Sequence, residues 1–172
     1  MPTTFKVVGP VEVRREGGKG GIITRQEGTD FWARAPEAKT VAGQQGCYVF
    51  ATRAGRGYTP WYVGKTTNSM RGECFQPDKT QKYNEALQKA GHGRPMLFFV
   101  VRCSGARGRV PSAAIGDMEK QLIHDGLQKN DRLLNTHNRN NLPCWAIKGV
   151  VRSGKGAPSR PAVKFRTMMG LQ

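Results

Sequence analysis

The stretch of residues 46–65, GCYVFATRAGRGYTPWYVGK, constrains the fold more than any other part of the chain. It contains two short apolar runs, at residues 47–50 and 61–63, and each run carries one tyrosine, Tyr48 or Tyr62. A basic, glycine-rich loop joins the two runs. An apolar run, a glycine-rich turn and a second apolar run are the pattern typical of a β-hairpin. We therefore expect two paired strands, with the tyrosines within the strands and not at the tip of the loop.

The flanking segments carry further secondary-structure signals. Residues 96–102, MLFFVVR, are apolar without alternation, which predicts a central strand covered on both faces. Residues 80–90 and 113–128 have apolar positions at helical spacing, so we expect a helix over each. Near the N-terminus, the loose alternation over residues 6–14 and the short run at 22–24 predict a small β-hairpin.

The charge balance points to a polyanionic partner. The 172 residues include 28 Lys and Arg against 12 Asp and Glu, which gives a net charge of +16. A strong field of one sign opposes compaction unless a partner uses it, so the composition favours nucleic acid. A charged surface that only keeps the protein soluble is the alternative explanation.

The sequence also indicates in which cellular compartment the protein works. The N-terminus lacks the pattern of a secretory signal peptide, and no apolar stretch approaches the roughly 20 residues that cross a bilayer. The four cysteines are widely spaced, without a C-x-x-C pair, which disfavours a zinc knuckle. We expect reduced thiols in a cytoplasmic protein that has no membrane contact.

Glu119 is the most informative charged residue. On a helical wheel of residues 113–128 it falls between Ile115 and Ile123, on the apolar face. An ionised carboxylate buried without a partner costs several kcal/mol, so Glu119 should have a cation nearby. Two cations fit: a Lys or Arg in an internal ion pair, or a divalent metal such as Mg²⁺, which prefers hard oxygen ligands. The helix alone does not decide between them.

One stretch resembles a nucleotide-binding motif but lacks a residue that the motif requires. The run YVGKTT looks like the end of a phosphate-binding loop, with a strand followed by Gly-Lys-Thr. That motif needs a glycine five residues before Gly64, and this position is Thr59. The sequence therefore disfavours nucleotide hydrolysis.

Five elements in one order resemble the GIY-YIG nuclease domain, over about residues 46–138. They are Gly46-Cys47-Tyr48, then Tyr62-Val63-Gly64, then Arg71 on a short helix, Glu119 on a later helix and Asn135 after it. The resemblance implies an α/β domain of the α+β type, with a small three-stranded antiparallel sheet flanked by helices. We place its strands at residues 46–51, 60–64 and 96–102.

The resemblance also implies an activity, the Mg²⁺-dependent (or Mn²⁺-dependent) cleavage of a DNA phosphodiester. In that scheme Glu119 is the only protein ligand of the metal, and Tyr48 or Tyr62 positions the attacking water. Arg71 stabilises the phosphate charge and Asn135 holds the architecture of the site. A phenol has a pKa of about 10, so we expect Lys65 or the metal to assist the tyrosine.

Two departures from the family pattern concern the hairpin loop and the catalytic cation. Thirteen residues separate Tyr48 from Tyr62, which predicts an extended hairpin loop. Arg71 lies about one residue from the usual helix position, so Lys79 or Lys82 could supply the cation instead.

We divide the chain into a β-rich N-terminal extension (residues 1–45), the nuclease-like domain (46–138) and a basic C-terminal extension that ends in a short helix (139–172). The side chains that we expect to contact DNA are Lys79, Lys82, Lys148, Arg152, Lys155 and Arg160. Two other functions stay open at this point. One is a nucleic-acid-binding module of the same fold without activity, and the other is a basic protein associated with RNA or the ribosome.

Overall fold

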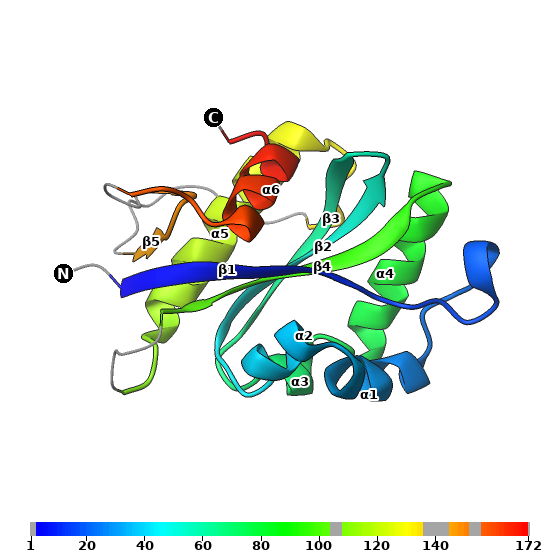
Figure 1. Ribbon diagram of the computed structural model, residues 1–172, viewed down its shortest axis with the longest axis horizontal. Coiled ribbons are helices and arrows are strands. Elements are labelled where there is room, and N and C mark those ends of the chain that lie inside the picture. The colour runs from blue at the N-terminus through cyan, green and yellow to red at the C-terminus, as the bar shows by residue number, and fades with distance from the viewer. Residues whose placement is uncertain (1–2, 104–107, 136–144, 152–155, 172) are drawn as a thin grey trace.

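The computed structural model describes residues 3–103, 108–135, 145–151 and 156–171. In this part of the chain, five strands form one mixed sheet with the order β3-β2-β4-β1-β5. Neighbouring strands are antiparallel except β1 and β5, which are parallel. The sheet is strongly curled (Figure 1). The strands are β1 (Thr3–Glu12), β2 (Gly46–Ala54), β3 (Gly57–Thr66), β4 (Arg94–Arg102) and β5 (Trp145–Ile147).

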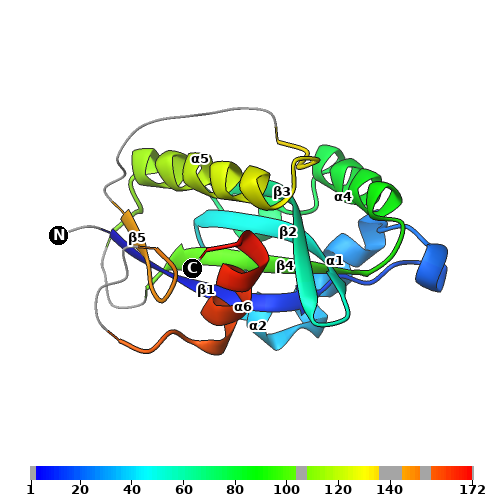
Figure 2. The same ribbon diagram turned by 90° about the horizontal axis from the view of Figure 1, so that it is seen from above.

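Helices cover both faces of the sheet (Figures 1 and 2). The first face packs against α5 and α6, in a hydrophobic cluster that includes Val49, Val63 and Phe98. The second face packs against α1 to α4, in a cluster that includes Phe50 and Phe99. The helices are α1 (Arg25–Arg34), α2 (Pro36–Val41), α3 (Met70–Glu73), α4 (Pro77–Ala90), α5 (Ser112–Lys129) and α6 (Arg160–Met169), with a 3₁₀ turn at Gly18–Gly20.

The prediction of a three-stranded antiparallel sheet is wrong. Strands do form over the three predicted segments, as β2, β3 and β4, but β1 and β5 extend the sheet beyond β4 and make it mixed. The apolar character of β4 explains the addition, because a strand buried from Pro95 to Val101 needs a pairing partner on each side. β2 supplies one partner and β1 the other.

The expected N-terminal β-hairpin is also not formed. β1 pairs with β4 instead, and the bridge between Glu16 and Ile22 lies beyond the first predicted arm, which ended at Arg14. The pairing register of β1 shifts between Val8 and Val11. Such an irregularity turns the later side chains to the opposite face, so Val7 packs with α5 and α6 whereas Val11 packs with the other helices.

The helix ends follow local rules. α4 begins at Pro77, earlier than predicted, because a proline is well accommodated at the first helical position. It ends before Gly91, whose φ of 71° suits glycine. α5 and α6 bury the apolar stripes that their sequences present. In the part of the chain that the structure describes, no helix combines the length and the apolar character needed to cross a membrane.

Candidate active site

The two motif tyrosines lie side by side on adjacent strands. In the pairing of β2 with β3, Tyr48 is opposite Gly64 and Phe50 is opposite Tyr62. Both tyrosines face the cluster covered by α1 to α4, with 6.3 Å between their ring centroids. Tyr48 is fully buried, whereas Tyr62 keeps 7% of its surface exposed. Of the pair, Tyr62 is therefore the phenol nearer to solvent.

Gly64 is the residue that makes room for Tyr48. A β-carbon at position 64 would lie 2.2 Å from Cζ and 2.3 Å from the hydroxyl oxygen of Tyr48. No atom pair tolerates such a separation, so the phenol end of Tyr48 occupies the space that a larger residue would need. The tyrosine of the first motif and the glycine of the second are one packing unit.

Burial dominates the chemistry of these phenols. It raises the pKa of Tyr48 well above its ordinary value, and it also raises the pKa of Tyr62. Tyr83 contacts both tyrosines through the same cluster, and its hydroxyl donates a hydrogen bond of 2.6 Å to the carbonyl oxygen of Cys74. At neutral pH all three side chains stay protonated. Tyr62 can thus position a water molecule through its hydroxyl, but it does not act as a free phenolate.

Glu119 does have a cationic partner, as its place on the apolar face of the helix predicted. Its carboxylate lies 2.8 Å from the ammonium of Lys65 on β3, with 17% and 45% of the two side chains exposed. The Glu119 charge also acts on two neighbours, where it adds to burial in raising the pKa of Cys47 and of Tyr62. Lys65 and Glu119 therefore lie on the α5 face of edge strand β3, whereas Tyr62 points to the face covered by α1 to α4.

The metal expectation rests on Glu119 alone. Within the described residues, no group of three or more His, Cys, Asp and Glu side chains converges as metal ligands. A partly exposed carboxylate is a suitable hard ligand for Mg²⁺ or Mn²⁺ when the other ligands are water or substrate oxygens. A metal at this carboxylate would displace the Lys65 ammonium, which is itself 45% exposed and long enough to move.

Two lysines of α4 supply positive charge beside Tyr62. The Lys82 ammonium lies 5.5 Å from the centroid of the Tyr62 ring. The Lys79 charge opposes the rise in the pKa of Tyr62. Lys79 is held by ion pairs with Asp78 and with Glu73, the latter at 3.4 Å. These contacts orient Lys79 while they neutralise part of its charge.

Arg71 lies elsewhere. It is exposed on α3 and lines a hollow of about 510 Å³ together with Arg25, Phe75 and Gln76. Neither Tyr62 nor Glu119 lines that hollow. The displacement follows from the local sequence, since the main chain of Arg71 is bonded to Ala42 and its side chain leaves the helix toward α1. The contact of Tyr62 with a cation is therefore that of Lys82, while Arg71 lines a different hollow.

Asn135 secures the edge strand. Its side-chain oxygen accepts a hydrogen bond of 2.7 Å from the Val63 amide, and its side-chain nitrogen donates one of 2.7 Å to the Val63 carbonyl. The backbone amide of Leu134 also donates a hydrogen bond to the backbone carbonyl of Trp61. Asn135 therefore holds β3 at the residue between Tyr62 and Gly64.

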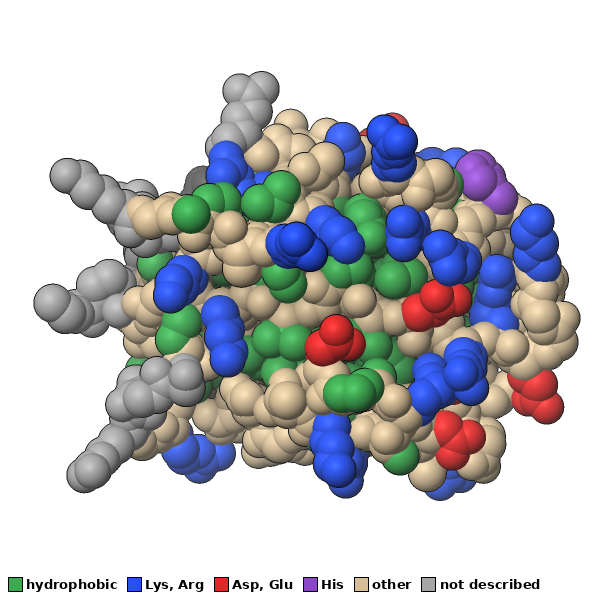
Figure 3. All heavy atoms as spheres, in the orientation of Figure 1, with side chains coloured by type: hydrophobic (Ala, Val, Ile, Leu, Met, Phe, Trp, Pro, Cys, Tyr) green, Lys and Arg blue, Asp and Glu red, His purple; other side chains and the backbone are tan. Residues whose placement is uncertain are grey.

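The expected nucleic-acid contacts are divided between two regions. Lys79 and Lys82 lie beside the tyrosines, whereas Lys148 follows β5 at the opposite edge of the sheet and Arg160 begins α6. The other two, Arg152 and Lys155, lie outside the described residues. Lys and Arg side chains are spread over the face drawn in Figure 3, with few acidic ones between them.

The sequence reasoning missed one cation near the site. Arg132 stacks on Trp61, with its guanidinium carbon 5.2 Å from the ring centroid, and bonds the carbonyl oxygen of Lys89. Arg132 therefore joins β3 to the end of α4. Arg132 could have been found from its position three residues before Asn135. A residue so close in sequence to one that binds the edge strand must itself lie near that strand.

Searches against models of protein families, curated proteins and solved structures found no match to this chain. The functional argument therefore depends on the geometry of the site.

Proposed function

We propose that the protein is a divalent-metal-dependent endonuclease that hydrolyses phosphodiester bonds of DNA. The observation that carries this proposal is that edge strand β3 holds the Lys65–Glu119 pair, 2.8 Å apart, on one face and Tyr62 beside the Lys82 ammonium on the other. A carboxylate, a hydroxyl and several cations are the groups that phosphodiester hydrolysis requires, because the reaction needs a positioned water and stabilisation of added negative charge.

Each residue has a defined task in this proposal. Glu119 would hold Mg²⁺ or Mn²⁺, which when bound supplies Lewis-acid stabilisation of the phosphate oxygens. The hydroxyl of Tyr62 orients the attacking water, and the cations Lys65, Lys79 and Lys82 stabilise the developing charge. Tyr48 is a positioning residue, because its fully buried ring holds Gly64 and Tyr62 in place and does not reach solvent.

The net charge of +16 supports a nucleic-acid substrate. Lysine contacts with phosphates release counterions, so we expect the affinity for DNA to fall steeply as salt is raised. A cytoplasmic location belongs to the same proposal. Its support is that Cys47, Cys74 and Cys103 are free thiols, as is usual in a reducing compartment.

A nucleic-acid-binding module without activity is the second candidate. The observation in its favour is the ion pair between Lys65 and Glu119, because a carboxylate that already has a cation 2.8 Å away needs no metal. In that case the basic surface is the whole function, and an RNA partner is as acceptable as DNA.

The test is incubation of supercoiled plasmid with Mg²⁺ and either the wild-type protein, Glu119→Gln or Glu85→Gln. Glu85 is exposed on α4 and loses the same charge, so it serves as the control. We expect nicking by wild type and Glu85→Gln, and about a 100-fold loss in Glu119→Gln. Binding without nicking by all three proteins contradicts the nuclease and favours the second candidate. A labelled RNA in parallel tests the RNA-associated alternative.

A further inference from the structure

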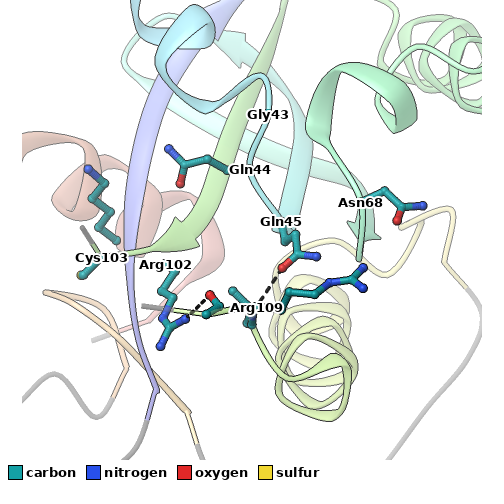
Figure 4. Close-up of a pocket in the computed structure, with 10 residues that line it drawn as sticks. Gly43, Gln44, Gln45, Asn68, Arg102, Cys103 and Arg109 are labelled. Carbon is teal, nitrogen blue, oxygen red and sulfur yellow. Dashed lines mark hydrogen bonds between the residues drawn. The ribbon is translucent and has the colours of Figure 1, made fainter. Parts of the chain in front are cut away.

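A second basic hollow lies at the end of the sheet where β2 begins and where β3 and β4 end (Figure 4). Its volume is about 480 Å³. Neither Tyr62 nor Glu119 lines it, so it is separate from the candidate active site. The lining side chains that carry the argument are Lys6, Gln45, Asn68, Arg102 and Arg109.

Hydrogen bonds hold the walls of this hollow in place. The side chain of Gln45 accepts a bond of 3.1 Å from the Val110 amide and donates one to the carbonyl of Thr67. Arg102 donates a bond of 2.9 Å to the carbonyl of Gly108. Three segments far apart in sequence are thereby joined before any ligand arrives. Preorganised donors of this kind lower the entropic cost of binding.

All the charged side chains that line the hollow are positive. Three of its lining residues are the cations Lys6, Arg102 and Arg109, and none is Asp or Glu. Among the described residues, the ion pairs include neither Lys6 nor Arg109. In Figure 4 the Arg109 side chain extends toward Asn68, across the side of the hollow opposite Arg102. Cations that are held together in this way favour an anion between them.

The lining identifies the anion as a backbone phosphate. No Phe, Tyr or Trp side chain is among the lining residues, so the hollow lacks the platform on which a base stacks. Arg guanidinium groups and side-chain amides are instead the usual donors to phosphate oxygens.

Helix α5 relates this hollow to the active site. The helix begins at Ser112, two residues after the lining residue Val110, and carries Glu119 seven residues later. Seven residues of helix span roughly 10 Å. We propose that this hollow binds a backbone phosphate of the nucleic acid, outside the candidate active site, and so sets the register of the strand. The inference rests on the proposed nucleic-acid partner and not on the cleavage step.

The experiment measures binding of a labelled DNA duplex by fluorescence anisotropy, without Mg²⁺, over a series of salt concentrations. Arg109→Gln is compared with Arg56→Gln, an exposed arginine in the turn between β2 and β3, at the opposite end of the hairpin. We expect Arg109→Gln to weaken binding roughly fivefold and to reduce the salt slope by about one. We expect a smaller change on both measures for Arg56→Gln.

Equal effects of the two substitutions, in variants that keep the wild-type melting temperature, would overturn the inference. If Arg109→Gln does not fold, the amide chemical shifts of the wild-type protein test the inference instead. Addition of duplex should shift Gly108 and Val110 more than Gly55 and Gly57, and unchanged Gly108 and Val110 amides again overturn it. A wild type that binds DNA at this hollow yet nicks no plasmid overturns the proposed nuclease alone. A wild type that binds no DNA overturns this inference as well.

Discussion

The ammonium of Lys65 and the carboxylate of Glu119 lie 2.8 Å apart and join the edge strand β3 to helix α5. They are 54 residues apart in sequence, and the pair brings the strand of the second motif against the helix that carries the acid. Glu119 is only 17% exposed, so water screens this ion pair less than it screens a fully exposed one.

The first prediction concerns the energy of this pair. A double-mutant cycle with Lys65→Met and Glu119→Gln should give a coupling of about 1 kcal/mol in the free energy of urea unfolding. The same cycle on Lys89 and Glu85, also 2.8 Å apart but within one exposed helix, should give about 0.3–0.5 kcal/mol. A coupling no larger than that of the control pair contradicts a role for Lys65 in holding the helix.

The second prediction concerns Gly64. Replacement by alanine places a β-carbon 2.2 Å from the Tyr48 ring, and the tyrosine is fully buried and cannot withdraw. We expect Gly64→Ala to lower the free energy of unfolding by about 1–3 kcal/mol. Gly57→Ala in the same strand is the control, because its nearest neighbour would be 3.8 Å away. Thermal unfolding of both variants tests this prediction, and equal melting temperatures refute it.

The third prediction concerns Asn135. Asn135→Asp keeps the shape of the side chain but replaces the donor to the Val63 carbonyl with an acceptor. We expect a loss of about 1–3 kcal/mol in the free energy of unfolding and faster hydrogen exchange at the Val63 amide. Asn68→Asp, at an exposed position, should change stability by less than about 0.5 kcal/mol. Unchanged exchange at Val63 would show that Asn135 does not hold the strand.

The fourth prediction separates the candidate cations. Lys79 acts on Tyr62, whereas Arg71 lines another hollow. We expect Lys79→Gln to lower the plasmid-nicking rate about tenfold or more, and Arg71→Gln to lower it by much less. Both variants lose one positive charge, so their general effect on DNA binding is matched. A larger effect of Arg71→Gln would restore the arginine to the site.

The fifth prediction concerns pH. Burial raises the pKa of Tyr48, Tyr62 and Tyr83, so the folded protein holds these protons more tightly than the unfolded chain does. The free energy of unfolding should therefore be unaffected by these groups below about pH 10, where unfolded tyrosines begin to ionise, and should fall as pH rises further. Urea unfolding from about pH 8 to pH 11 measures the decline. Tyr48→Phe should reduce the slope, and an unchanged slope contradicts the assignment of Tyr48.

Much of the candidate site could be predicted, because local patterns determine it. Two apolar runs and a glycine-rich turn indicated the hairpin of β2 and β3, and the helical period put Glu119 on an apolar face. The sheet around the hairpin could not be predicted in the same way. The N-terminal strand has a weak alternation that suits several partners, and only the demand of the buried strand β4 for a second neighbour placed it.

The expected extended hairpin loop is wrong, because β2 continues to Ala54 and β3 begins at Gly57, which leaves a two-residue turn. The sequence by itself did determine the hairpin at the tyrosines and the helix that carries Glu119, and it required a cation for Glu119. Those properties depend on neighbours within a few residues, so the sequence order contains them. Only the tertiary structure decided that the cation is Lys65, that lysines of α4 and not Arg71 face Tyr62, and that Tyr48 fills the space beside Gly64. Each of these depends on how separate elements pack, and packing is set by the burial of whole faces at once.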